Sequence, residues 1–486
     1  MMTVQSFEPT MFLAILPEIL LVVLAGLIMA FDAIWKPATK KILGWLTAAG
    51  LLIAMIVTFL VTTPPDGGRL IFGGMIRQDW LSFAFTILFM FAAAITSLFT
   101  SDMHGVGQKG EFYVLMLIST IGMSLMASSA DIIMLYLSIE TTSIPMYILA
   151  GFMTRDEKST ESGFKYLLFG AAASTIMLYG FSLLYGFTGQ TNIYQIALNF
   201  YNFEFPKVAI IGSLLLILVG FSFKISAFPF HFWAPDVYEG APTPIAGFLS
   251  TASKAAGFVV ILRVLVTIFT PSVSADWINL LAIVSVLTMT IGNVLALAQK
   301  NIKRLLAYSS IAHAGYILIG VVAISQLGLS SVVFYLIAYL ITNLAAFGVV
   351  MAFSSVVGSD EISAYSGLSR RKPALALALL VAFLSLAGMP PLAGFIAKVI
   401  VFAAAVKVGL VWLAFVGVLN SIIGLYYYLT VLKYVYLFRS DDEEKPLNIS
   451  RPYSIALIIL IFGIILVGTL FGPWFNLSNQ IASSLF

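Results

Sequence analysis

The chain has 486 residues, of which 60% are hydrophobic and only 10% are charged. A soluble protein carries about 25% charged residues, so this composition cannot supply a water-facing surface. The small net charge of +3 argues against a nucleic-acid partner, and the lack of cysteine excludes disulfides, cysteine-ligated clusters and thiolate chemistry.

Apolar runs long enough to span a membrane follow one another along the chain. We count about fourteen, taking about 20 residues as the criterion. The first run, roughly 11–31, lacks a basic flank and is too long for a typical signal peptide, so we interpret it as a genuine span. We therefore predict an all-α polytopic membrane protein, with residues 1–486 forming a single membrane domain. The approximate span centres are Val22, Ile53, Met90, Thr120, Pro145, Ile176, Ile217, Lys254, Leu287, Ala312, Ala338, Leu386, Gly424 and Phe462.

Basic residues gather in the loops after odd-numbered spans. The positive-inside rule then places these loops in the cytoplasm and both termini on the non-cytoplasmic side. Representative loop residues are Lys36, Lys40, Lys41, Lys109, Arg155, Lys300, Arg370, Arg371 and Arg439.

Several charges fall inside the predicted spans. Glu140 lies about 13 Å beyond Asp131 at the helical rise, and Lys254 is also central. A charge at the bilayer centre costs at least about 2.5–3.5 kcal/mol, so such residues are usually functional. Arg263 lies nearer a span end, where we expect it to snorkel and favour a structural role. Lys165 follows Glu161 by one helical turn, so a surface pair and a channel role both stay open.

Two spans are interrupted beside a lysine. Residues 373–406 contain no charge but Lys398, and as one helix they would extend about 50 Å, against a hydrocarbon core of about 30 Å. Glycines and prolines in LAGMPPLAGFIAKVIVF supply the break. Residues 207–233 are similar, with Lys224 shortly before Pro229.

Two interrupted spans in successive parts of one chain point to an inverted-repeat transporter. We predict a first repeat over about 110–270 and a second over about 276–438, flanked by helices within 11–100 and 452–472. The broken helices are an odd number of spans apart, which gives the two copies opposite topology.

The buried charges suggest proton transfer. Burial disfavours a charged lysine and a nearby carboxylate favours it, so a Glu140–Lys224 pair could switch protonation by changing separation. Lys254 could relay the proton and Lys398 could serve as the exit-side site. His313 could bridge these two lysines, although a packed neutral histidine fits equally well. The alternative for all these charges is a set of buried structural ion pairs.

Three stretches resemble a known family. FPFHFWAPDVYEGAPTPIAGFLSTASKAAGF resembles the core of the antiporter-like subunits of complex I, closest to the N-type subunit of bacterial NADH–quinone oxidoreductase. NIKRLLAYSSIAHAGYILIG and SLAGMPPLAGFIAKVIVF agree with it. Lys398, where the M-type sibling usually has glutamate, and the lack of the long L-type C-terminal extension favour the N type.

This resemblance implies about 14 transmembrane helices, with two inverted repeats of about five helices and broken seventh and twelfth helices. It maps a pumping glutamate–lysine pair to Glu140 and Lys224, the central lysine to Lys254 and the exit-side lysine to Lys398.

The implied role is that of a proton-translocating subunit of a redox-driven NADH (or other donor):quinone oxidoreductase in the bacterial plasma (inner) membrane. No cofactor is expected on this chain. Quinone, FMN and iron–sulfur clusters would belong to partner subunits, which include other antiporter-like and quinone-site membrane subunits. The alternatives are an Mrp-type sodium/proton antiporter subunit without redox coupling and a scaffold that does not transport.

Overall fold

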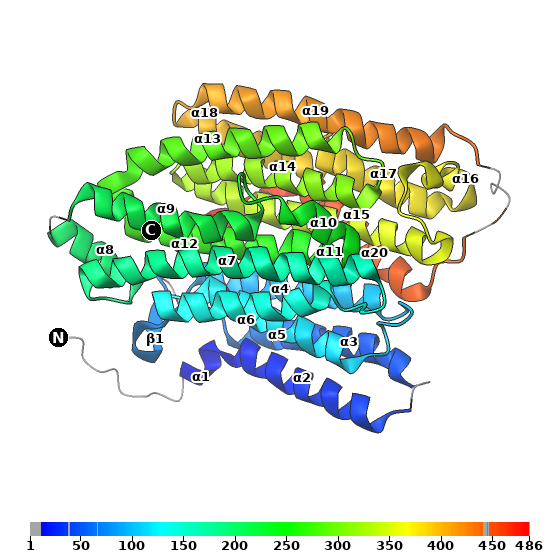
Figure 1. The fold of residues 1–486 in the computed structure, drawn as a ribbon, viewed down its shortest axis with the longest axis horizontal. Helices are drawn as coiled ribbons and strands as arrows, with labels where there is room; N and C mark the ends of the chain where they lie inside the picture. Colours follow the sequence, from blue (N-terminus) through cyan, green and yellow to red (C-terminus); the bar gives the residue numbers. More distant parts are fainter. Residues whose placement is uncertain are drawn as a thin grey trace.

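Long helices lie side by side in the computed structural model, which describes residues 11–36, 39–65, 67–203, 205–440, 445 and 447–485, without the side chains of 270–275 (Figure 1). Thirteen helices of this described part are long and apolar enough to cross a membrane. A further predicted span is present as two shorter helices, α17 (Pro373–Ala387) and α18 (Ala393–Lys407). Helices satisfy every backbone polar group internally, which lipid requires. The predicted polytopic helical fold is confirmed; the chain ends, Met1 and Phe486, lie outside the described residues.

The remaining helices and strands have the following bounds in chain order. They are α1 (Met11–Ala14), α2 (Leu16–Ile34), α3 (Leu43–Val61), β1 (Arg69–Ile71), β2 (Ile76–Gln78), α4 (Trp80–Thr100), α5 (Gly110–Ser128), α6 (Ile132–Ala150), α7 (Glu157–Thr188), α8 (Ile193–Asn202), α9 (Lys207–Ile225), α10 (Trp233–Gly240), α11 (Thr243–Phe248), α12 (Lys254–Val264), α13 (Thr270–Ala296), α14 (Ile302–Val322), α15 (Gln326–Val357), α16 (Leu368–Arg371), α19 (Val411–Tyr436), α20 (Arg451–Thr469) and α21 (Phe471–Ser483). Strands β1 and β2 pair antiparallel.

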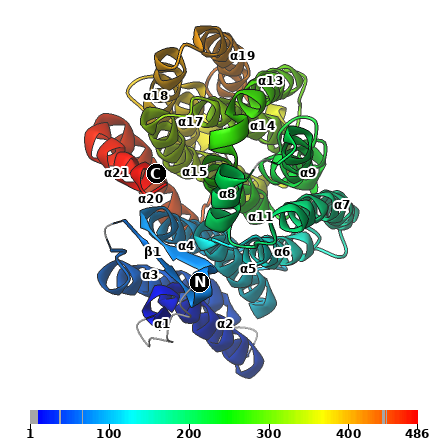
Figure 2. The same ribbon diagram turned by 90° about the vertical axis from the view of Figure 1, so that its left-hand side faces the viewer.

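The helices differ in how much of their surface is covered. Seen down the bundle, α14 and α15 lie among other helices, while α2 and α3 lie at the lower edge and α18 and α19 at the upper edge (Figure 2). In three spans, 94% of an 18-residue apolar stretch is buried inside the protein, against 28% for α2. These spans are Thr243–Phe269, Ile302–Val322 and Gln326–Val357. The most buried spans therefore include those that carry Lys254 and His313.

Both expected interruptions are present. Helix α9 ends at Ile225, because Ser226 adopts a left-handed backbone with φ of 57°. The chain resumes as α10, whose Trp233 donates its indole N–H to the carbonyl of Phe223 at 3.2 Å. Lys224 therefore lies before the first break, whereas Lys398 lies after the second, on α18.

Two features were not predicted. The eighth span contains π-helical segments at Leu249–Ser253 and Leu265–Phe269, and the first ends directly before Lys254. Single π-helical turns are frequent at functional sites. The last predicted span, α20, is followed by α21, which packs against α15 and α4. Helix α21 carries too few apolar residues for the sequence to predict a membrane span there.

Several features recur an odd number of spans apart. Helices α7 and α15 each have 32 residues and end at a glycine with left-handed backbone. Helices α6 and α14 each begin at a side-chain cap, supplied by Asp131 and Asn301. Each cap residue also forms an isolated β-bridge to the chain just after the following long helix, at Asn192 and Glu361 respectively.

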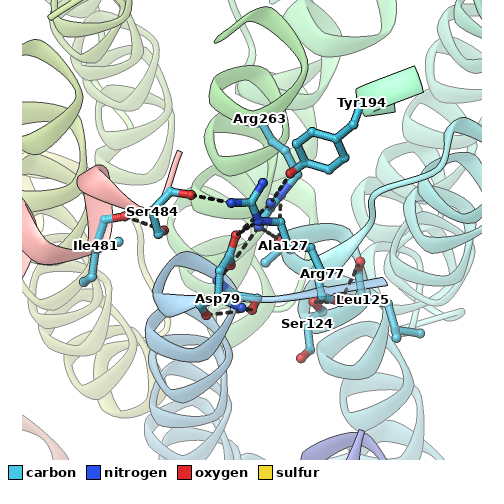
Figure 3. Close-up of polar contacts among 11 residues, drawn as sticks. Arg77, Asp79, Ser124, Leu125, Ala127, Tyr194, Arg263, Ile481 and Ser484 are labelled. Carbon is cyan, nitrogen blue, oxygen red and sulfur yellow. Dashed lines mark hydrogen bonds and ion pairs between the residues drawn. The ribbon is translucent and has the colours of Figure 1, made fainter. Parts of the chain in front are cut away.

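Arg263 is buried instead of snorkelling, so that expectation is wrong. Its guanidinium binds Asp79 through two hydrogen bonds of 2.9 and 3.0 Å, and it also donates to the carbonyl of Ala127 and the hydroxyl of Tyr194 (Figure 3). Asp79 is fully buried and caps the N-terminus of α4. The pair therefore ties α12 to α4 and α5, which supports the structural role.

We expect Asp79→Ala to destabilise the protein by about 3–5 kcal/mol, because it leaves a buried guanidinium without its counter-ion. The thermal unfolding midpoint of the detergent-solubilised complex measures this change. The matched control is Lys207→Ala, which removes the exposed Lys207–Asp276 pair and should cost about 1 kcal/mol or less. Equal effects of the two variants would contradict the structural role of Arg263.

Candidate functional site

Glu140 and Lys224 line one small cavity between α6, α7 and α9. Glu140 accepts a hydrogen bond from the hydroxyl of Ser174 on α7. Lys224 is 5% exposed and donates to the hydroxyl of Ser143, one turn beyond Glu140 on α6, at 2.9 Å. The two charged groups form no direct ion pair in the described part of the chain.

The cavity between them measures about 10 Å³. A volume of about 10–15 Å³ is the least that holds one water molecule. Serine hydroxyls lie on both sides of this space, at Ser143 and Ser174. The arrangement can therefore pass a proton between Glu140 and Lys224 through hydroxyls or one water, without direct contact.

Lys254 lies at the centre of the bundle. It begins α12, is 2% exposed and donates to the hydroxyl of Ser310 on α14. Its ammonium nitrogen lies 5.9 Å from the ring centroid of Tyr238 on α10. On the same helix, Gly257 packs against the side chain of Lys224: a Cβ there would lie 3.1 Å from the Lys224 Cγ. Helix α12 therefore carries Lys254 and packs against Lys224.

His313 lies on α14, one turn after Ser310. Its Nδ1 is 2.9 Å from the hydroxyl of Tyr335, and its Nε2 is 3.4 Å from that of Tyr428. A neutral imidazole donates through one nitrogen and accepts through the other, so both ring nitrogens have partners. Tyr428 also shares a hydrogen bond with Ser309, so the ring belongs to a polar network.

Lys398 reaches back across the helix break. It is 6% exposed, and its ammonium donates to the carbonyls of Leu386 and Ala387 at 3.0 Å each. These carbonyls belong to the last turn of α17, the partially negative end of that half-helix. The break itself needs Gly388, whose φ is 87° and where a Cβ would lie 2.9 Å from the Lys398 side chain.

Three of the four lysines that are buried in the described part of the chain share one property, and the fourth, Lys303, pairs with Asp360. Within the described residues, Lys224, Lys254 and Lys398 are paired only with neutral oxygens and form no ion pair. The alternative of structural ion pairs therefore does not fit them, although it fits Arg263. A lysine without a counter-ion can lose its proton, whereas an arginine stays charged.

His231 is a buried residue that the sequence analysis did not single out. It lies in the break after α9 and is 2% exposed, and its Nδ1 has no partner within the described structure. Its place within FPFHFW, beside the predicted break, was the available signal.

Lys165 belongs to a surface network and not to the buried row. It pairs with Glu161 and Asp236 at 2.6 Å each, and Arg304 pairs with Asp236 and Glu239. Burial opposes ionisation of Asp236, but its hydrogen bonds from Lys165 and Arg304 lower its pKa below the ordinary value. The surface ion pair of Lys165 with Glu161, one of the two roles that the sequence left open, is therefore present.

The chain is similar to membrane subunits of known complexes. Residues 129–424 match the family model described as NADH:quinone oxidoreductase/Mrp antiporter, TM. NADH-quinone oxidoreductase subunit N 2 of Chloroherpeton thalassium is 41% identical, over 96% of this chain and 94% of that protein. A chain of respiratory complex I from Thermus thermophilus with bound aureothin has a TM-score of 0.79 and 33% identity, covering 95% of this chain and 98% of that one. A chain of the Mrp complex from Dietzia has a TM-score of 0.86 and covers 99% of this chain and 98% of that one, but its 21% identity shows the fold alone.

We expect Asp236→Asn to lower the thermal unfolding midpoint at neutral pH but not at low pH. Because the folded pKa of Asp236 lies below its ordinary value of 3.8, its contribution is present above that value and lost as pH falls through the folded pKa. Midpoints of both proteins from pH 7 downward measure this, with Asp276→Asn as the surface control. A difference that stays constant down to the lowest pH would refute it.

Proposed function

This chain belongs to the antiporter-like subunit N family of NADH-quinone oxidoreductases, and we propose that it moves protons along a buried row that includes Glu140, Lys224, Lys254, His313 and Lys398. It is a multi-span membrane subunit of a proton-translocating NADH:quinone oxidoreductase, and its partners are the other membrane subunits of that complex. The observation that carries the row is the burial of three lysines with only neutral partners.

The contacts support an order along the row. Glu140 and Lys224 share one cavity, and the Lys224 side chain packs against α12, the helix of Lys254. Lys254 binds Ser310, which precedes His313 by one turn of α14. The Lys398 ammonium lies 5.0 Å from the ring of Tyr316, one turn beyond His313. Each step thus joins neighbouring helices of the bundle interior.

Each site changes charge by gaining or losing one proton. Protonation of Lys224 is favoured when the Glu140 carboxylate approaches it and disfavoured when the carboxylate withdraws. The hydroxyls of Ser143 and Ser174 accept and donate in turn, so they can pass the proton without ionising. His313 either relays between Lys254 and Lys398 or packs as a neutral ring. Lys398 serves as the exit-side site.

The electron-transfer parts of the complex are assigned to partner subunits. Quinone, FMN and iron–sulfur clusters would be held there, while this chain contributes the proton path. The quinone-site subunit and the other antiporter-like subunits are the expected neighbours, within a bacterial plasma membrane. The positive-inside rule places both termini on the non-cytoplasmic side. The repeats at about 110–270 and 276–438 are supported by the recurring helix lengths, caps and β-bridges.

We expect Lys224→Ala and Glu140→Gln to reduce quinone-dependent proton pumping by roughly tenfold or more, while the complex stays assembled. Each variant removes a group that takes up a proton in the row. Pumping is measured with a pH-sensitive dye in membrane vesicles, together with the electron-transfer rate and subunit content.

The matched control is Lys207→Ala, because Lys207 lies on the same helix but is exposed and paired with Asp276. It should pump as the wild type does. If the assembled Lys224→Ala complex pumps at the wild-type rate, the proposed row is wrong. Lys224 and its pairing with Glu140 would then have only a structural role.

A further inference from the structure

A second polar cavity lies far from the lysine row, at the end of the bundle where α2 begins. It measures about 30 Å³ and is lined by residues of α2, α3, β2, α4 and α5. Most of its polar lining consists of hydroxyl and amide side chains, with one carboxyl, Glu18, and one guanidinium, Arg77. At about 10–15 Å³ for each, this volume holds about two water molecules.

Two side-chain oxygen atoms at this cavity are buried and have no hydrogen-bond partner among the residues that the structure describes. They are Oε2 of Glu18 and Oγ1 of Thr58, and Thr58 is 0% exposed. Buried polar atoms nearly always have a hydrogen-bond partner, and a polar cavity with room for water supplies one. Both atoms belong to residues that line the same space, on α2 and α3. Water is therefore the ligand that fits.

The other carboxylate oxygen of Glu18 begins a chain of hydroxyls. Ser124 donates to Oε1 of Glu18, and the hydroxyl of Thr86 lies 2.6 Å from that of Ser124. Either hydroxyl of the second bond can donate. The chain therefore accommodates both forms of Glu18: an ionised carboxylate accepts from Ser124, and a protonated one donates when both hydroxyls turn.

Two kinds of effect act on the protonation of Glu18 in opposite directions. Burial favours the protonated form of a carboxyl, whereas a nearby guanidinium and the N-terminal turn of a helix favour the ionised form. Glu18 lies in the first turn of α2, and Arg77 lines the cavity from β2. Arg77 pairs with Asp79 at 3.2 Å and so joins the Arg263 network (Figure 3). Because 18% of the Arg77 side chain is exposed, the cavity also adjoins the surface.

We propose that Glu18 is a proton-exchanging carboxyl that, with water bound at Thr58, forms a protonatable site outside the lysine row. A proton from the surface reaches the carboxylate through the cavity water, which donates one proton to Oε2 as it accepts another. Release runs in reverse, so the water stays neutral and charge and atoms balance. The inference rests on the proposed function for its role: Glu18 takes up and releases protons at the end of the bundle where α2 begins.

The first test is infrared difference spectroscopy of the assembled complex during a pH step, in light and heavy water. Glu18→Gln keeps the size of the side chain and an oxygen that accepts from Ser124, but it cannot titrate. We expect the wild type to show a protonated carboxyl band that is absent from this variant. The matched control, Glu111→Gln, changes an exposed glutamate in the first turn of α5 and should keep the band.

A second variant covers the case in which Glu18→Gln fails to assemble. Thr58→Val removes the second partner of the proposed water and leaves Glu18 in place, so it should shift the frequency of the same band. Spectra of both variants identical to the wild type would overturn the inference. So would an unshifted band in assembled Thr58→Val if Glu18→Gln cannot be prepared.

Pumping separates this inference from the proposed function. If Lys224→Ala stops pumping but Glu18→Gln leaves both the band and pumping unchanged, only the Glu18 site is wrong. If Lys224→Ala pumps normally while the Glu18 band is lost as expected, the lysine row is wrong and the carboxyl site stands.

Discussion

Removing an ionised side chain from water costs several kcal/mol, and this bundle meets that cost in two ways. Arg263 is compensated by the carboxylate of Asp79, and it donates further hydrogen bonds to a backbone carbonyl and a tyrosine hydroxyl. The pair therefore joins α12 to α4 and α5. Among the described residues, Lys224, Lys254 and Lys398 are compensated only by neutral oxygens. Such partners satisfy the hydrogen bonds of an ammonium without opposing the loss of its proton as strongly as a carboxylate would, which supports the proposal that these three lysines exchange protons.

Helix breaks make it possible to bury a lysine without a carboxylate partner. The last carbonyls of a helix carry a partial negative charge, and a break brings such an end inside the bundle. Lys398 binds the final turn of α17, and Lys224 lies in the final turn of α9. A dipole of this kind favours the ammonium without introducing a second titratable group. The positive-φ residues that end these helices, Ser226 and Gly388, are thus part of the electrostatics as well as of the chain path.

The sequence predicted the spans, the buried lysines and the two breaks because each depends on local composition. Twenty apolar residues, a lysine among them, and a proline–proline pair are visible without any tertiary contact. The partners of those charges were not predictable, because they come from distant positions: Asp79 lies 184 residues from Arg263. The same reason hid the burial of His231 and the cavity at Glu18. The π-helical segment before Lys254 was missed because its residues carry no breaker signal.

The fixed and the exchangeable charges meet on α12. Arg263, near one end, is held by Asp79, while Lys254, at the other end, follows the π-helical segment. The Asp79–Arg263 ion pair ties the helix to α4 and α5 whatever the charge of Lys254. Under the proposed function, a change of protonation at Lys254 would then be met by rearrangement of its own side chain and of Ser310, not by movement of the helix. A proton carrier at the centre of a close-packed bundle needs this separation, since packed helices do not deform continuously.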